Sequence, residues 1–315
     1  MYISWNIKRF IWKVRSFLDK HMGIPMNFKK YNGKHILTAE ETNTYLKEKL
    51  LKGEKLAAGR IGGNELGALV VRQKEERGKE QTHDKYSLLY LLAGYFDPED
   101  TMDRFAETLG KAIGSFDLIS VWFNQMEDVM LKRYGRRDVS YGRLEGLEPW
   151  YHRGDPWSAA LKGKKVLVIH PYAKSIEKQY RENRDRLFSG TDILPEFELQ
   201  TIKAVQTIYQ TEDERFKSWY DALEYMYEEA MGRDFDVALI ACGAYGMPLA
   251  AKLADSGRNV IHMGGALQLL FGIRGKRWDD MEELKGFYND AWVRPGDDEK
   301  IDPEKEKNVE HGCYW

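Results

Sequence analysis

Residues 236–263 read DVALIACGAYGMPLAAKLADSGRNVIHM. This stretch opens and closes with a short apolar run, and between the two runs lies a glycine-containing turn followed by small and apolar residues. A strand, a turn, a helix and a second strand of these lengths are typical of a βαβ unit, in which the two strands run parallel. We therefore predict strands at 236–241 and 259–263 and a helix at 247–256.

The same alternation extends toward the N-terminus. Residues 165–170, Lys-Val-Leu-Val-Ile-His, form a β-branched run that ends at Pro171, as expected of a central parallel strand. The other expected strands are 55–58, 116–123 and 198–206. Helices are expected at 38–51, where Thr38 and Glu41 form a capping box, and at 66–73 and 175–188. We expect two more helices within 86–114, with a break near Asp97-Pro98, and a further helix that is capped by Thr211 or Asp213. The fold class that we predict is α/β, a Rossmann-like and mostly parallel sheet with helices on both faces.

Composition divides the chain of 315 residues into three parts. We expect residues 1–37 to hold a basic amphipathic helix and a loop, 38–292 to hold the Rossmann-like domain, and 293–315 to form a charged tail, solvated from Asp297 to Asn308. Glycines and prolines gather near 146–163, and this predicts an internal linker or a long surface loop there.

The overall composition excludes several classes of protein. A hydrophobic fraction of 43% excludes intrinsic disorder as the main state, and two cysteines exclude a disulfide framework. A net charge of −2 argues against nucleic acid as a partner, and no apolar stretch is long enough for a membrane span. The few cysteines suit a reducing compartment, so we expect a cytoplasmic protein, with the inner face of the membrane as an alternative.

The first twenty residues form the predicted amphipathic helix. They contain five basic residues and one acidic residue, and apolar residues recur at helical spacing: Ile7, Phe10, Ile11, Val14, Phe17 and Leu18. One interpretation is a helix docked on the protein's own core. The other is a helix lying on an anionic membrane surface, which would make that surface a partner.

Ligands of open parallel sheets bind at the carboxyl ends of the strands, and four motifs fall there. The first is 242–246, Cys-Gly-Ala-Tyr-Gly, where Gly243, Tyr245 and Gly246 precede a helix and suit a nucleotide phosphate. A tight structural turn is the alternative. The second is 262–268, His-Met-Gly-Gly-Ala-Leu-Gln, and its candidate contacts to base, ribose or phosphate are His262, Gly264, Gly265 and Gln268. A core histidine is the alternative there, and the basic residues that follow, Arg274, Lys276 and Arg277, suit either a pyrophosphate or solvent.

The third motif follows the strand 165–170. His170 suits a general base or a phosphate donor, and Lys174 and Ser175 precede a helix and suit an anion. A capped turn with Ser175 as N-cap is the alternative. The fourth motif is 60–65, Arg-Ile-Gly-Gly-Asn-Glu, with Arg60 as a fixed cation and Glu65 in a first helical turn, where the helix dipole favours an acid for structural reasons alone.

These residues resemble bacterial glycosyltransferase-like proteins of the GT-D type, whose genes tend to lie in capsule, lipopolysaccharide and glycoprotein glycosylation loci. The family signature, a strand, Arg-x-Gly-Asp-Gly-Glu and a helix, corresponds to 60–65, and the similar blocks His170-Pro171, 236–246 and 261–265 extend the resemblance over most of 40–292. It implies a Rossmann-like enzyme of polysaccharide biosynthesis that transfers a sugar from a nucleotide sugar to a glycan, glycoprotein or lipid-linked acceptor. We therefore expect Arg60, Glu65 and His170 to be catalytic and Gly62 to help bind the nucleotide sugar.

One departure from the family concerns the metal. The Asp-x-Glu pair, which holds a divalent metal in the family, reads Gly63-Asn64-Glu65 here. Either Asn64 and Glu65 still hold Mg²⁺ or Mn²⁺, or Arg60 and a second cation replace the metal, or the protein binds a nucleotide sugar without catalysis.

Two other classes stay open at this point. One is a nicotinamide-dependent enzyme that acts on a sugar nucleotide, although His262 stands where an acidic ribose-binding residue would close the strand 259–263. The other is a non-catalytic assembly protein that uses its nine tryptophans, eighteen tyrosines and basic N-terminal helix as contact surfaces.

Overall fold

The computed structural model describes residues 2–24, 26–78, 86–97, 102–211, 213–301 and 305. Its centre is one sheet of nine strands in the order β1-β2-β5-β4-β3-β9-β8-β6-β7. Every neighbouring pair is parallel except β1 and β2, which are antiparallel. The strands are β1 (Lys30–Tyr31), β2 (Lys34–Leu37), β3 (Ala57–Gly59), β4 (Leu118–Val121), β5 (Ser140–Arg143), β6 (Lys165–His170), β7 (Glu198–Lys203), β8 (Val237–Ile240) and β9 (Asn259–His262). The predicted fold class is confirmed.

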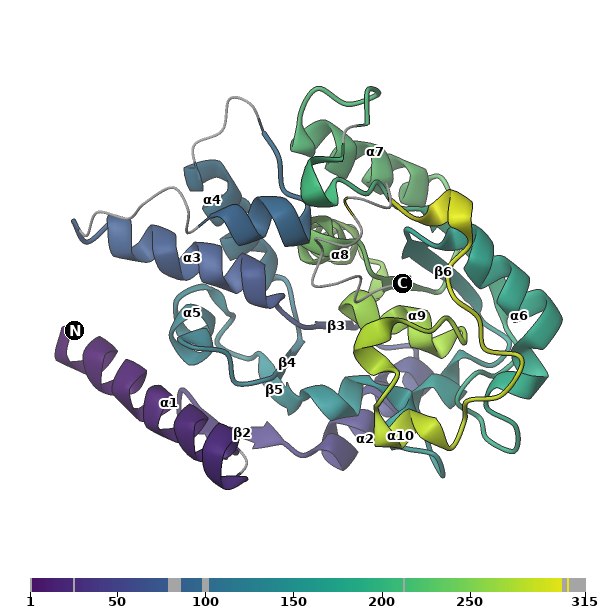
Figure 1. Ribbon diagram of the computed structural model, residues 1–315, viewed down its shortest axis with the longest axis horizontal. Helices are drawn as coiled ribbons and strands as arrows, with labels where there is room; N and C mark the ends of the chain where they lie inside the picture. Colours follow the sequence, from purple (N-terminus) through teal and green to yellow (C-terminus); the bar gives the residue numbers. More distant parts are fainter. Residues whose placement is uncertain are drawn as a thin grey trace.

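Helices cover both faces of the sheet (Figure 1). One face carries α3 (Gly63–Glu75), α4 (Met102–Gly114), α5 (Glu127–Tyr134), α7 (Trp219–Met231) and α8 (Gly246–Asp255). The other face carries α2 (Ala39–Lys52), α6 (Ala173–Leu187), α9 (Leu267–Leu270) and α10 (Glu282–Lys285). A hydrophobic core lies on each face of the sheet, between the strands and the helices. The strands contribute to both cores, because successive side chains of a strand point to opposite faces. In β6, for example, Leu167 and Ile169 join the first core, whereas Val166 and Val168 join the second.

Helix starts follow local capping chemistry. Thr38 and Glu41 form the predicted capping box of α2. The cap predicted for α7 is wrong: the helix begins after Ser218, which forms a capping box with Asp221. The Asp213 carboxylate is held by the Arg215 side chain and cannot serve the helix. Between residues 86 and 114 the described part contains α4 and one π-helical turn, η2 (Leu89–Ala93), and Pro98 of the expected break lies outside the described residues.

The prediction of a linker or a long surface loop near 146–163 is wrong. This stretch forms three short 3-10 helices, η3 (Leu144–Leu147), η4 (Pro149–Tyr151) and η5 (Trp157–Leu161), on the face that carries α2. Trp150 and Trp157 are fully buried, and the backbone N–H of Trp157 donates to Asn43 of α2 at 2.6 Å. The tryptophans and leucines between the glycines and prolines decide the outcome, because burying large apolar side chains outweighs a turn-forming composition.

Only part of the C-terminal tail that the structure describes is solvated as predicted: Asp297 and Asp298 are exposed, but the residues that follow turn inward. Glu299 and Ile301 are buried. The Glu299 carboxylate accepts the backbone N–H groups of Lys174 at 2.7 Å and Ser175 at 3.0 Å, and also the Ser175 hydroxyl. A carboxylate at the start of α6 satisfies N–H groups that have no partner within the helix, so this segment closes onto the domain. Most of the tail beyond Ile301 lies outside the described residues.

The predicted N-terminal helix is present as α1 (Tyr2–Met22), which lies along the outside of the domain (Figure 1). Among the described residues, no helix combines the length and the apolar character needed to cross a lipid bilayer.

Candidate functional site

A cavity of about 420 Å³ opens at the carboxyl ends of the central strands. Its walls are the loops that follow β3, β4, β6, β7, β8 and β9, together with η2 and Arg277. The neighbours β6 and β8 lead into α6 and α8, which cover opposite faces of the sheet. Loops that diverge in this way leave a crevice at a topological switch point, the usual ligand site of an open α/β sheet.

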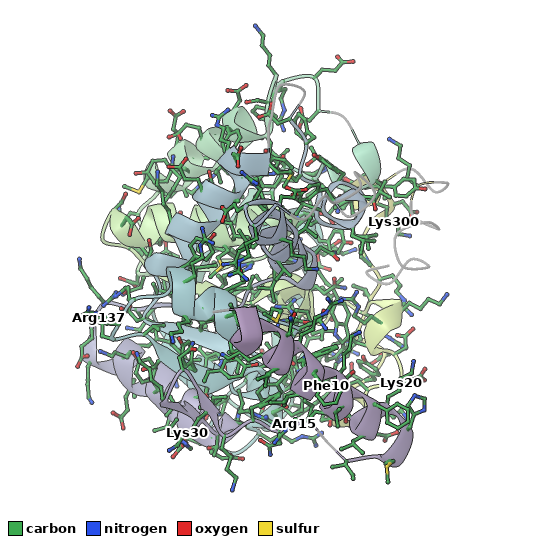
Figure 2. All side chains as sticks on the ribbon, turned by 90° about the vertical axis from the view of Figure 1, so that its left-hand side faces the viewer. Phe10, Arg15, Lys20, Lys30, Arg137 and Lys300 are labelled. Atoms are coloured by element: carbon green, nitrogen blue, oxygen red, sulfur yellow. The ribbon has the colours of Figure 1, made fainter. Side chains whose placement is uncertain are left out.

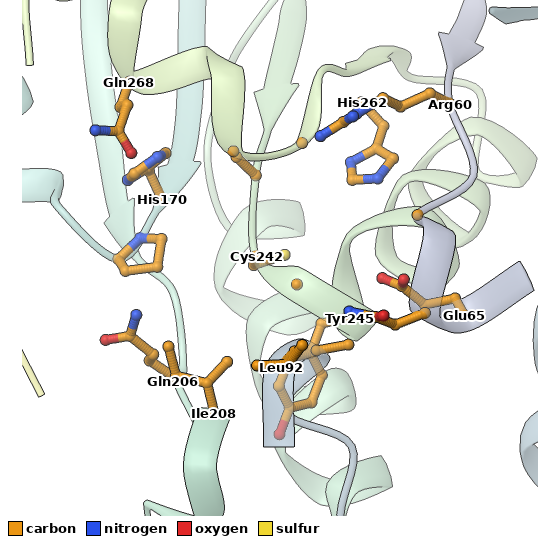
Figure 3. Close-up of a pocket in the computed structure, with 18 of the residues that line it drawn as sticks. Arg60, Glu65, Leu92, His170, Gln206, Ile208, Cys242, Tyr245, His262 and Gln268 are labelled. Carbon is orange, nitrogen blue, oxygen red and sulfur yellow. The ribbon is translucent and has the colours of Figure 1, made fainter. Parts of the chain in front are cut away.

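Most of the predicted site residues meet at this cavity. Figure 3 shows Arg60, Glu65 and His262 together on one side and His170 with Gln268 on the other. The predicted residues among those that line it are Arg60, Gly62, Asn64, Glu65, His170, Gly243, Tyr245, His262, Gly264, Gly265 and Gln268.

Three predicted residues lie outside the cavity lining. Lys174 and Ser175 contact the C-terminal segment through Asp298 and Glu299, as described above. Gly246 lies beneath the ring of His262, and a Cβ atom at Gly246 would overlap that ring. Gly246 therefore provides space for a residue of the cavity wall.

Arg60 is fixed at the cavity by three neighbours. Its Nε donates to the carbonyl of Met263 at 3.0 Å, and its guanidinium lies 4.9 Å from the ring centre of Trp122. It also lies against Gly264, whose φ of +65° favours glycine and whose missing Cβ leaves room for the guanidinium. A cation held in this way needs no rearrangement to meet a phosphate.

Glu65 is the only acidic side chain among the described residues that line the cavity. Burial raises the pKa of this carboxyl, while its own backbone N–H and the charge of Arg60 oppose that rise. The carboxylate folds back over Gly62, where a Cβ would overlap it. The position of the Glu65 carboxylate therefore requires glycine at position 62.

The two histidines have opposite tautomers, which their hydrogen bonds define. The Nδ1 of His170 accepts the backbone N–H of Tyr172 at 2.9 Å, so its proton resides on Nε2. The Nδ1 of His262 lies 3.2 Å from the carbonyl of Ile240, so there the proton resides on Nδ1 and Nε2 carries a lone pair. Burial lowers the pKa of both rings to about 3, and Arg60 adds to this effect at His262. Both rings therefore line the cavity in the neutral form, His170 with a donor at Nε2 and His262 with an acceptor at Nε2. His170 suits phosphate donation better than general-base chemistry.

The remaining wall was not predicted from the sequence. It consists of Trp122, residues 205–208, and Leu92 and Ala93 of η2. Trp122 donates from Nε1 to the carbonyl of Ile61 at 3.0 Å, which ties the loop after β4 to the loop after β3. A tryptophan after a buried strand was the available signal, but it equally fits a core residue.

The loop after β4 has a strained backbone. Phe123 and Met126 have φ values of +62° and +68°, which non-glycine residues rarely adopt. The buried Glu127 compensates, because it accepts the N–H of Phe123 at 2.9 Å and the hydroxyl of Tyr31 at 3.3 Å. Glu127 therefore holds the loop that presents Trp122 to the cavity.

The protein groups at the cavity suit a metal ion only in part. The described residues contain no cluster of three or more histidine, cysteine, aspartate or glutamate side chains that could hold one. Glu65 supplies a single carboxylate, so a Mg²⁺ or Mn²⁺ ion here would take most of its ligands from water and from phosphates of the substrate.

Comparison with known proteins found two similar solved structures, both of a domain of unknown function numbered 1792. One is a selenomethionine-substituted structure with a TM-score of 0.38, and the other, with a TM-score of 0.39, is described as having a distinct glycosyltransferase fold. Each match has 12% sequence identity and covers 83% of this chain and 95% of the other. No protein-family model and no curated protein matches the chain. We therefore argue the function from the cavity.

Proposed function

We propose that this protein is a glycosyltransferase that binds a nucleotide-diphosphate sugar in the cavity and transfers the sugar to a glycan, glycoprotein or lipid-linked acceptor. The observation that carries the proposal is the convergence, at the switch point of a parallel sheet, of a fixed cation, one carboxylate and glycine-lined loops. A nucleotide diphosphate needs cations and backbone N–H groups, and a sugar hydroxyl needs a carboxylate.

Each wall has a role in the proposal. Arg60 and Arg277 neutralise the diphosphate, whose negative charge grows as the bond to the sugar breaks. Gly264 and Gly265 bring backbone close to it, and the Nε2–H of His170 donates to a phosphate or base oxygen. Glu65 holds a sugar hydroxyl or, through a bridging divalent ion, the diphosphate.

The test begins with binding. We expect UDP-, GDP- or TDP-sugars to raise the melting temperature, and a ligand at 100 times its dissociation constant contributes about 2.7 kcal/mol. Parallel titrations with and without Mn²⁺ measure the contribution of a metal. The best donor is then used to measure release of the nucleotide diphosphate in the presence of glycan and lipid-linked acceptors.

Glu65→Gln is the decisive variant. We expect transfer to fall by about 10²-fold with little change in melting temperature, because the neutral amide keeps the shape and loses the charge. The matched control is Glu40→Gln, which removes an exposed acid from the first turn of α2 and reports the helix-dipole effect alone, at most about 1 kcal/mol. Full transferase activity in Glu65→Gln would contradict the role of Glu65. Binding without transfer would favour the non-catalytic alternative, and a response to a nicotinamide cofactor alone would favour an oxidoreductase.

A further inference from the structure

Helix α1 exposes an apolar stripe along its outer side. The side chains of Ile7, Phe10, Ile11, Val14 and Phe17 are all exposed, with Phe10 at 67% and Phe17 at 58%. They occupy successive turns on one face of the helix. Figure 2 faces α1 and shows it at the surface of the molecule.

The domain holds α1 by the opposite face. The Nε1 of Trp12 donates to the carbonyl of Phe123 at 2.6 Å, and Lys8 forms an ion pair with Asp128. Trp12 and Val14 are two residues apart, so their side chains leave the helix about 200° apart. The helix is thus docked on the domain, as one interpretation of the sequence expected, but its apolar stripe points away from the core.

Two exposed lysines flank the stripe. Lys13 follows Phe10 by three residues and precedes Phe17 by four, and Lys20 follows Phe17 by three, so both lie along one flank. Arg15, on the other flank, lies 4.6 Å from the ring centre of Phe28 and helps to hold the helix against the segment that follows it. A stripe of Ile, Phe and Val beside a row of lysines is complementary to a surface that has an apolar interior and an anionic rim.

We propose that α1 binds the surface of an anionic phospholipid bilayer and lies in the plane of that surface. The apolar stripe enters the boundary between headgroups and acyl chains, and Lys13 and Lys20 meet the lipid phosphates. The Trp12 and Lys8 contacts hold the rest of the domain to the helix, so the whole protein is recruited. This proposal does not depend on the proposed function.

The docking connects α1 to the wall of the cavity. Phe123, which accepts from Trp12, directly follows Trp122, and Trp122 lines the cavity. If the proposed function holds, this arrangement suits an acceptor that is itself anchored in the bilayer.

The experiment is co-sedimentation of the full chain with phosphatidylcholine vesicles, with and without phosphatidylglycerol. We expect binding to the anionic vesicles that weakens with salt. The Phe10→Glu/Phe17→Glu variant should lose about tenfold or more in affinity, because two acids replace the largest exposed side chains of the stripe. Lys13→Gln/Lys20→Gln should lose about fivefold for each lysine on anionic vesicles and little on neutral ones.

A matched control distinguishes binding through the stripe from binding through any exposed apolar side chain. Leu51→Glu removes a leucine that is 63% exposed on α2 and should leave binding unchanged. All variants should melt at the wild-type temperature, since each site is exposed. Equal pelleting of wild type and Phe10→Glu/Phe17→Glu, or no pelleting of wild type, would overturn the proposal. So would a concentration-dependent dimer in sedimentation equilibrium that the Phe10→Glu/Phe17→Glu change abolishes, since the stripe would then bind a second copy.

Discussion

At the residue scale, His170 and His262 each use Nδ1 to hold the backbone and leave Nε2 for a ligand. An asparagine side chain can reproduce the hydrogen bond of Nδ1 at both positions. At 170 its amide oxygen accepts the backbone N–H of Tyr172, and at 262 its amide N–H donates to the carbonyl of Ile240. Asparagine has no atom at the position of Nε2. We expect His170→Asn and His262→Asn each to weaken nucleotide-sugar binding by about tenfold, the effect of one lost hydrogen bond. Isothermal titration at pH 7.5 measures this.

The histidine variants carry their own internal control. His→Leu at either position removes the anchoring bond as well, so it should lower the melting temperature more than His→Asn does. Wild-type affinity in both asparagine variants would show that neither Nε2 meets the ligand.

At the element scale, Glu127 joins α5 to the strained loop after β4, and its protonation links that loop to pH. Burial raises the pKa of Glu127 from 4.5 to about 8, although N–H groups of the loop oppose the rise. The folded protein therefore binds more protons at this site than the unfolded chain between about pH 4.5 and 8. The stabilising contribution of Glu127 is complete below pH 4.5 and is lost as the pH rises through 8.

Glu127→Gln should remove this dependence, because glutamine resembles the protonated acid. We expect the stability of wild type relative to the variant to fall between pH 5 and pH 9 by more than about 1.4 kcal/mol, the equivalent of one pKa unit. Denaturant unfolding at the two pH values measures the change. Glu107→Gln is the control: the ion pair with Lys111 lowers the pKa of Glu107, so its contribution is constant over this range. Parallel pH curves for wild type and Glu127→Gln would refute the assignment.

Elements with one dominant local signal could be predicted from the sequence. The β-branched run of β6 and the Thr38 capping box are such signals, and both elements appear with the expected bounds or within a residue of them. The 3-10 helices at 144–161 could not be predicted, because the tertiary contacts of Trp150 and Trp157 decide their position. The same limit applies to the site: strand ends and glycines indicate the loops after β3, β6, β8 and β9, whereas Trp122 and residues 205–208 reach the cavity only through packing.

At the scale of the whole molecule, Glu299 joins the end of the described domain to the start of α6. Glu299→Ala would leave two backbone N–H groups and the Ser175 hydroxyl without their partner. We expect a loss of about 1–2 kcal/mol in the free energy of unfolding, as for removal of a helix N-cap. Thermal and denaturant unfolding measure it. Asp297→Ala, at a side chain that is 98% exposed, should change stability by no more than about 0.5 kcal/mol. Equal stability of the two variants would show that the Glu299 contacts do not stabilise the fold.

The glycines at the cavity have a consequence for how such a site can change during evolution. Gly62, Gly264 and Gly246 each leave space that a neighbouring side chain fills: Glu65, Arg60 and His262. A methyl group at any of these glycines would displace the acid, the cation or the imidazole. Loss of the partner would free Gly62 and Gly246 to vary, whereas the φ of +65° would still favour glycine at 264. The glycine and its partner should therefore change together during evolution. Remote relatives of this protein should be easier to recognise by such pairs of positions than by single invariant residues.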